Sequence, residues 1–216
     1  MKALRFLLII VCILSLTGCA STKQADSDSS LGKAQQTLDS LYQHYSAKDS
    51  YLLRESYPFD EQHKVTYLAS EDQANTPNQF SYLWPYSGTF SAVNALFEAT
   101  HDKKYQKLLD KRVLPGLEEY FDIQRTPNAY SSYIQTAPTS DRFYDDNVWL
   151  GIDFTDIYQI TQEKRYLDKA QLIWKFIESG TDSLLGGGIY WCEQKKESKN
   201  TCSNAPGSVL ALKLFK

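Results

Sequence analysis

Residues 96–105 read LFEATHDKKY, and residues 157–166 read IYQITQEKRY. In each stretch, the end of one apolar stripe is followed by a Thr, then by an acidic residue, and then by basic residues and a Tyr. Thr100 and Thr161 can cap the helix that follows, and the acid falls in its first turn, where the helix dipole favours negative charge. Short capped turns of this kind predict antiparallel helix hairpins.

Apolar residues recur with helical spacing along most of the chain. Leu38, Leu41, Tyr42 and Tyr45, for example, lie at i, i+3, i+4 and i+7 and form one stripe. No alternating, strand-like pattern extends beyond a few residues. The periodicity predicts about six helices, near residues 31–48, 83–99, 103–121, 145–160, 163–179 and 206–215.

The connections between these helices are of two lengths. Three long ones cover about residues 50–82, 123–143 and 181–205, and they are rich in Tyr, Asn, Ser and Pro. Hairpins that recur with long loops between them indicate an all-α solenoid closed into a toroid. In such a ring the long loops emerge at one end and line a central cleft, where their polar and aromatic residues suit a polysaccharide.

The N-terminus has the features of a bacterial lipoprotein. Residues 1–18 combine a cationic start with an apolar run that is too short to span a bilayer, and they predict a signal peptide. Cys19 ends a lipobox-like LTGC and is the expected acylation site, although a plain secretory signal with a chance cysteine is the alternative. Residues 19–30 predict a flexible tether. We expect a protein anchored by lipid in the cell envelope, at the outer membrane, with its leaflet undecided.

Residues 31–216 amount to one domain. The formal net charge of −3 argues against a nucleic-acid partner, whose phosphates call for a basic face. Aromatic residues make up 13% of the chain, and rings with a polar tip suit sugar faces as well as ordinary packing.

Four cysteines fit an exported protein. Cys12 leaves with the signal peptide and Cys19 carries lipid, so Cys192 and Cys202 are expected to form a disulfide worth roughly 3 kcal/mol. The three histidines lie far from these cysteines in sequence, so we expect no metal site and no cofactor.

Residues 144–151 read YDDNVWLG and contain paired carboxylates beside aromatic rings. Acidic residues at a helix start are also common for the dipole alone, so capping is the plain alternative. Asp145 and Asp146 can reach one substrate only near a helix end that faces the cleft. Two carboxyls so close favour a retaining glycosidase, in which their mutual repulsion keeps one of them protonated.

This motif and a second one, the GGGIYWCE…KNTCSNAPG run at residues 186–207, together resemble glycoside hydrolase family 76, the α-1,6-mannanase family. The resemblance implies an (α/α)6 toroid that cleaves the backbone of α-mannan internally. It implies that Asp145 is the nucleophile and Asp146 the general acid/base. The residues expected to contact substrate are Trp84, Tyr86, Tyr144, Asn147, Trp149, Tyr190, Trp191 and Glu193, with Asn204 a weaker candidate.

The helix count is about half of the twelve that this fold implies, and the chain stops inside an amphipathic helix. We therefore expect an N-terminal part of such a domain, inactive or poorly soluble when expressed alone. One alternative is a non-catalytic, glycan-binding surface lipoprotein. Another is a different toroid enzyme, such as an unsaturated-uronyl hydrolase or a sugar epimerase, although an epimerase would call for histidines near the cleft.

Overall fold

The computed structural model describes residues 27–64 and 78–215. The chain divides into two compact units, Met1–Lys33 and Ala34–Lys216, and the second unit carries the candidate site. The predicted signal peptide, the acylation of Cys19 and most of the tether lie outside the described residues, so lipid anchoring stays a prediction. In the described part of the chain, no helix combines the length and apolarity that a membrane crossing requires.

The predicted helices are present, with two changes. The segment expected at 103–121 is broken by a π-helical turn, and the last helix begins before residue 206. The helices are α2 (Ser30–Tyr45), α4 (Leu83–Thr100), α5 (Lys103–Leu108), η1 (π, Leu109–Val113), α6 (Leu114–Glu118), α7 (Tyr144–Thr161), α8 (Lys164–Ser179), η2 (3-10, Leu184–Gly186) and α9 (Thr201–Phe215). Strands β1 (Phe121–Asp122) and β2 (Ala129–Tyr130) pair antiparallel.

The two look-alike junctions do form tight turns between antiparallel helices. His101 and Gln162 end α4 and α7 in the left-handed conformation, with φ of 54° and 59°. The prediction that Thr100 and Thr161 cap the following helices is wrong, because Asp102 and Glu163 occupy the N-cap positions. Each Thr hydroxyl donates to the carbonyl four residues back, at 2.6 and 2.8 Å, and accepts from the N–H of that N-cap residue, at 3.2 and 3.3 Å. Asp102 caps α5 instead, accepting from the N–H of its second residue at 2.9 Å.

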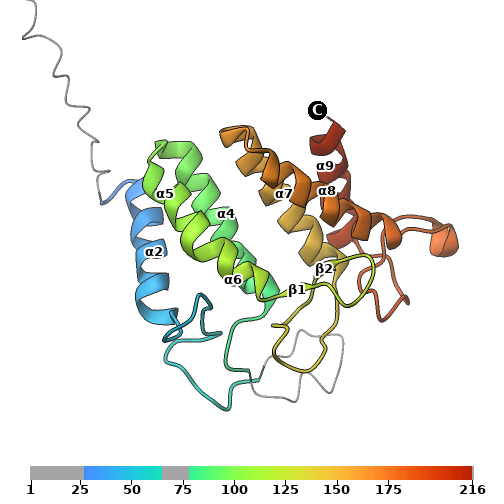
Figure 1. Cartoon of the computed structure of the whole chain (residues 1–216), viewed down its shortest axis with the longest axis horizontal. Helices are drawn as coiled ribbons and strands as arrows, with labels where there is room; N and C mark the ends of the chain where they lie inside the picture. Colours follow the sequence, from blue (N-terminus) through green and yellow to red (C-terminus); the bar gives the residue numbers. More distant parts are fainter. Residues whose placement is uncertain (1–26, 65–77, 216) are drawn as a thin grey trace, which may run out of the picture. The chain divides into compact units, whose positions relative to one another are not determined.

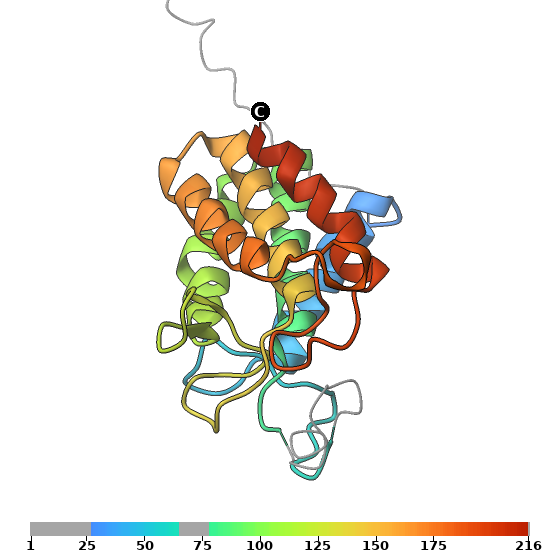
Figure 2. The same cartoon turned by 90° about the vertical axis from the view of Figure 1, so that its right-hand side faces the viewer.

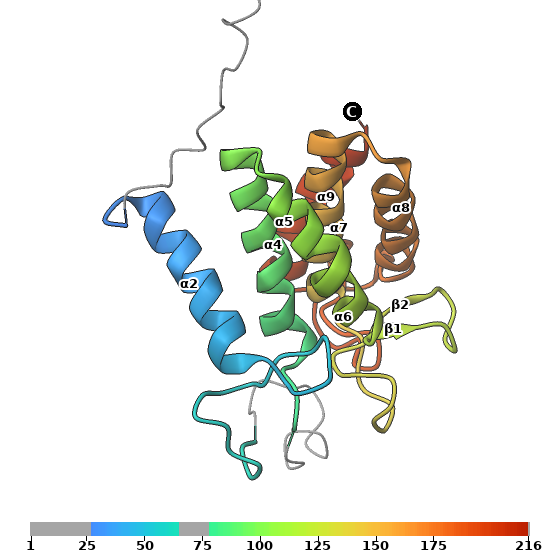
Figure 3. The same cartoon turned by 60° about the vertical axis from the view of Figure 1, so that its left-hand side comes forward.

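Helix α7 packs against α4, α8 and α9 (Figure 1). Figure 2 shows α9, in dark red, running beside α7 and α8. The short turns α4–α5 and α7–α8 lie at one end of these helices, and the long connections around β1 and β2 and after α8 lie at the other (Figure 3). The N-termini of α4, α7 and α9 share the end with the long loops, so the prediction of helix hairpins with long loops at one end is confirmed.

Close packing joins α7 to α4 of the preceding hairpin and to α8, its own hairpin partner. The ring of Phe154 meets Phe90 of α4 edge to face, with centroids 4.9 Å apart. Tyr144 stacks on Phe176 of α8 at 4.6 Å. These four rings are all buried, and they fix where the first turn of α7 stands.

Gly151→Ala is expected to lower the free energy of unfolding by about 1–3 kcal/mol, because a Cβ at this position would lie 2.5 Å from Leu210 Cδ2 on α9. Gly88→Ala in α4 is the matched control. A Cβ there meets nothing within 4 Å, so the change is expected to stabilise by about 0.5–1 kcal/mol. Urea unfolding of both variants measures the difference, and an equal effect of the two would contradict a tight α7–α9 contact.

A buried carboxyl lies between α4 and α7. Asp153 Oδ2 accepts from Ser91 Oγ at 2.8 Å, and its backbone carbonyl accepts from Asn94 Nδ2 at 2.9 Å. Burial raises the pKa of Asp153 to about 7, with Asp156 adding to the rise and Lys213 opposing it. The folded protein therefore keeps this proton at pH values where an unfolded aspartate has lost it.

The free energy of unfolding is expected to fall as pH rises from about 4 to 7, since in this window the folded chain binds one proton more at Asp153 than the unfolded chain does. The slope from this one group is at most about 1.4 kcal/mol per pH unit. Asp153→Asn is expected to flatten that part of the decline, measured by urea unfolding at pH 4.5 and 7.5. An exposed change, Asp168→Asn, serves as the control; an unchanged slope in Asp153→Asn would contradict the assignment.

Candidate active site

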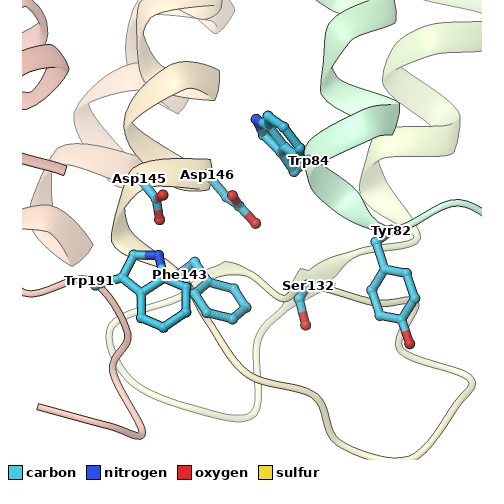
Figure 4. Close-up of a pocket in the computed structure, with 7 residues that line it drawn as sticks. All are labelled: Tyr82, Trp84, Ser132, Phe143, Asp145, Asp146 and Trp191. Atoms are coloured by element: carbon cyan, nitrogen blue, oxygen red, sulfur yellow. The ribbon is translucent and has the colours of Figure 1, made fainter. Parts of the chain in front are cut away.

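A cavity of about 200 Å³ opens at the loop end of α4 and α7. Figure 4 shows the side chains around it, with the two aspartates between Trp84 on one side and an aromatic pair on the other. The loop after β2 reaches the start of α4 through a hydrogen bond from Leu83 N to Ser132 O at 2.8 Å. The lining residues are Tyr82, Trp84, Ser132, Phe143, Asp145, Asp146 and Trp191.

Both aspartates lie in the first turn of α7, but their surroundings differ. Asp146 is 8% exposed. Burial, followed by the nearby charge of Asp145, raises its pKa well above the ordinary value for an aspartate. Asp146 is therefore the member of the pair that holds its proton more strongly.

Asp145 is less buried and better supplied with donors. Burial raises its pKa, while the Cys202 thiol, the backbone amides of residues 145 and 146 and the side chain of Trp191 act in the opposite direction. Among the described residues, none donates a hydrogen bond to the buried oxygen Oδ1. Asp145 is thus the member of the pair that ionises more readily, and its buried oxygen Oδ1 has an unused capacity to accept a hydrogen bond.

Aromatic side chains form the walls of the cavity. Trp84 stands at the start of α4 and is 59% exposed, as a ring that stacks on a sugar would be. Trp191 packs on Phe143, with ring centroids 5.0 Å apart. Trp149 is also exposed, but it does not line the cavity.

Sequence reasoning missed three lining residues, Tyr82, Phe143 and Ser132. Tyr82 and Phe143 directly precede the first residues of α4 and α7. Their position just before a predicted helix start could have identified them as lining residues. Ser132 comes from the middle of a long loop, and nothing local in the sequence distinguishes it.

Three tyrosines predicted to contact substrate are buried elsewhere, and those predictions are wrong. Tyr86 donates to the carbonyl of Val113 at 3.1 Å. Tyr190 reaches the carboxylate of Asp182 at 3.0 Å. Tyr144 is only 1% exposed, beneath the first turn of α7. Each ring packs in the interior while its hydroxyl or edge finds a local partner, as buried tyrosines usually do.

Two further predicted contacts, Asn147 and Asn204, hold the backbone of segments between helices instead. The amide of Asn147 accepts from Tyr130 N and donates to Tyr130 O, both at 2.9 Å. Asn204 does the same for Ile189, at 2.7 and 2.8 Å. Each amide nitrogen also donates to the carbonyl oxygen four residues earlier, Phe143 O for Asn147 and Asn200 O for Asn204, both at 2.9 Å. We call these two side chains the amide brackets.

Glu193, the last predicted contact outside the cavity, forms an ion pair with Arg142. The Glu193 carboxylate therefore binds a side chain of the protein itself.

The predicted disulfide is wrong, since Cys192 and Cys202 are both free thiols. Cys192 is buried opposite Phe143 in an isolated antiparallel bridge, and burial raises its pKa to about 11. Cys202 is exposed in the first turn of α9, where its thiol hydrogen-bonds to Asp145. Within residues 27–64 and 78–215, no three His, Cys, Asp or Glu side chains are grouped as a metal ion would need.

A family model described as glycosyl hydrolase family 76 matches residues 56–216, close to three-quarters of the chain. The chain belongs to this family of glycoside hydrolases. No curated protein sequence matches it.

Solved structures of the same family resemble the chain. A family 76 glycoside hydrolase (mannosidase) from Bacteroides thetaiotaomicron is 30% identical, with a TM-score of 0.70 over 86% of this chain and 48% of that one. A family 76 enzyme from a bovine strain of that species is 30% identical, with a TM-score of 0.67 over 87% and 38%. The chain thus spans about half the length of its relatives, or less.

A third structure has the same fold and contains a ligand. It is an inactive variant of an α-1,6-mannanase from Salegentibacter, with two consecutive aspartates replaced by alanine, in complex with α-1,6-mannotetrose. This protein is 24% identical, with a TM-score of 0.60 over 87% of this chain and 45% of that one.

Proposed function

We propose that the protein carrying this chain hydrolyses the α-1,6-linked backbone of mannan internally and with retention of configuration. The observation that carries the proposal is a cavity in which two consecutive aspartates of unlike environment stand between exposed aromatic rings. Relatives of the same family include an α-1,6-mannanase whose inactive variant binds an α-1,6-linked mannose oligomer.

Each aspartate has a distinct task in this reaction. Asp146, which keeps its proton, donates it to the glycosidic oxygen as the bond from that oxygen to the anomeric carbon breaks. The Asp145 carboxylate attacks the anomeric carbon and forms a glycosyl ester. Water then attacks this carbon, Asp146 takes up the water's proton, and Asp145 leaves as a carboxylate. Atoms and charges balance over the two steps, and each aspartate returns to its starting state.

The test is to incubate the protein with α-1,6-mannan and to follow the products by chromatography and proton NMR. Release of oligosaccharides whose first-formed reducing ends are α-anomers is expected. First-formed β-anomers would contradict retention. Mannan binding with no product, unaltered in Asp145→Asn and Asp146→Asn, would instead identify a glycan-binding protein.

Trp84→Ala is expected to weaken the binding of α-1,6-mannotriose about 3- to 10-fold, because an exposed ring on the cavity wall provides stacking worth about 0.5–1.5 kcal/mol. Trp149→Ala is the comparison, since that indole is also exposed but does not line the cavity, and we expect unchanged affinity. Isothermal titration calorimetry measures both. A loss in Trp149→Ala equal to that in Trp84→Ala would contradict the placement of the sugar.

A further inference from the structure

Arg142 is the largest side chain buried completely in the described part of the chain. Its Nε donates to Glu193 Oε2 at 2.7 Å, and its Nη2 donates to the other carboxylate oxygen, so the pair is bidentate. Nη1 donates to the backbone carbonyl of Pro127 at 2.9 Å, and the guanidinium lies 4.9 Å from the centroid of Phe176. The arginine is thus held on several sides at once.

The ion pair joins two segments that meet in an antiparallel bridge. Glu193 N donates to Arg142 O at 3.0 Å, and Tyr144 N donates to Trp191 O at 2.9 Å. The Arg142–Glu193 pair and the Tyr144–Trp191 pair therefore flank the bridged residues Phe143 and Cys192 along the two segments. Asp145 follows Tyr144 directly, so the geometry of this bridge sets the distance between Trp191 and the aspartates.

Trp191 forms a hydrogen bond with Asp145 and affects Asp145 differently from Asp146. Figure 4 shows its indole nitrogen turned toward Asp145, on the cavity side that it shares with Phe143. Its hydrogen bond is one of the interactions that favour the ionised form of Asp145. Asp146 is affected by burial and by the charge of its neighbour, and both oppose its ionisation.

We propose that Arg142 and Glu193 are positioning residues that hold the Trp191 indole against Asp145 and thereby separate the roles of the two aspartates. This inference deepens the proposed function, on which its importance for catalysis rests. Glu193 acts through Trp191 and does not touch the sugar, because its carboxylate is occupied by a fully buried guanidinium.

The first test is Glu193→Gln, which removes the charge and keeps the size. The indole N–H signal of Trp191, assigned with Trp191→Phe, is followed by NMR, together with the pH titration of aspartate carboxyl carbons. The indole signal is expected to shift, and the lower of the two midpoints of the aspartate pair to rise, because the ionised form of Asp145 loses a donor. Glu163→Gln is the matched control; it breaks an exposed Arg–Glu pair with Arg165, and it is expected to change neither signal.

Glu193→Gln removes the bidentate carboxylate and leaves the buried Arg142 charge with only Asp122, whose Oδ2 lies 3.7 Å from Nη1, so a second variant guards against a folding defect. Gln194→Ala removes the side chain that accepts from Arg142 N at 2.7 Å and loosens the same segment with no buried charge stranded. Smaller changes in the same direction are expected. If Gln194→Ala, and Glu193→Gln where it folds, leave the indole signal and the aspartate midpoints at wild-type values, the positioning role is wrong.

These signals do not depend on turnover, so the inference can fail separately from the proposed function. Altered signals in a protein that never releases product would support the positioning role and refute the hydrolase proposal. Where product is released, the acid limb of the kcat/KM profile is expected to move to higher pH in Glu193→Gln by the same amount as the carboxyl midpoint. An unmoved acid limb beside a moved midpoint would overturn the link to catalysis.

Discussion

Asp146→Asn is expected to reduce the hydrolysis of α-1,6-mannan by about 10²- to 10⁴-fold and to leave the affinity for α-1,6-mannotriose within about twofold. Asparagine has almost the same shape, but it cannot give a proton to the departing oxygen. The raised pKa of Asp146 fits the role of proton donor that we propose for the wild-type residue. Initial rates measured by reducing-sugar release, with calorimetry for affinity, test the expectation.

A substrate with a different leaving group distinguishes the roles of the two aspartates. With an aryl mannoside whose phenol leaves without protonation, formation of the glycosyl ester should recover in Asp146→Asn but not in Asp145→Asn. The burst of released phenol reports this step. Equal losses in both variants on both substrates would contradict the assignment of acid and nucleophile, and wild-type rates in either variant would exclude the pair from the mechanism.

Arg142→Met is expected to lower the free energy of unfolding by about 3–5 kcal/mol. The change leaves Glu193 without its cation, although that carboxylate side chain is only 20% exposed, and it removes the donor to the carbonyl of Pro127. Adding Glu193→Leu should restore part of the loss, since the second change removes the stranded charge. Urea unfolding of the two single variants and the double variant forms a double-mutant cycle.

Arg165→Met is the matched control for this cycle. Arg165 also forms ion pairs, with Asp110 and Glu163, but its side chain is 50% exposed, so a loss below about 1 kcal/mol is expected. Additive effects of Arg142→Met and Glu193→Leu would show that the buried pair does not act as a unit.

Helix positions were largely predictable because periodicity and turn chemistry agree along this chain. Helices α4, α7 and α8 lie where the apolar stripes place them. The start of α9 was missed because Pro206 suggests a first helical residue, whereas here it lies in the second turn. A proline so near the start of a helix costs few backbone hydrogen bonds, and the preceding turn forms despite it.

The site was only partly predictable. Asp145 and Asp146 stand out as a pair, and Trp84 and Trp191 do lie beside them. The tyrosines could not be sorted, since a ring with a hydroxyl serves equally in a core or on a cavity wall. Arg142 gave no signal at all, because its partner lies 51 residues away and only the fold brings the two together.

The amide brackets carry a consequence for variation within this architecture. Asn147 holds Tyr130 of β2, and Asn204 holds Ile189, each through the backbone N–H and C=O of one residue. These contacts recognise main chain and do not depend on the side chain there. Stretches of loop beyond those anchoring points can change in length and composition without disturbing the helical frame. If the proposed function holds, we expect variants with altered rim segments to keep the helical scaffold unchanged.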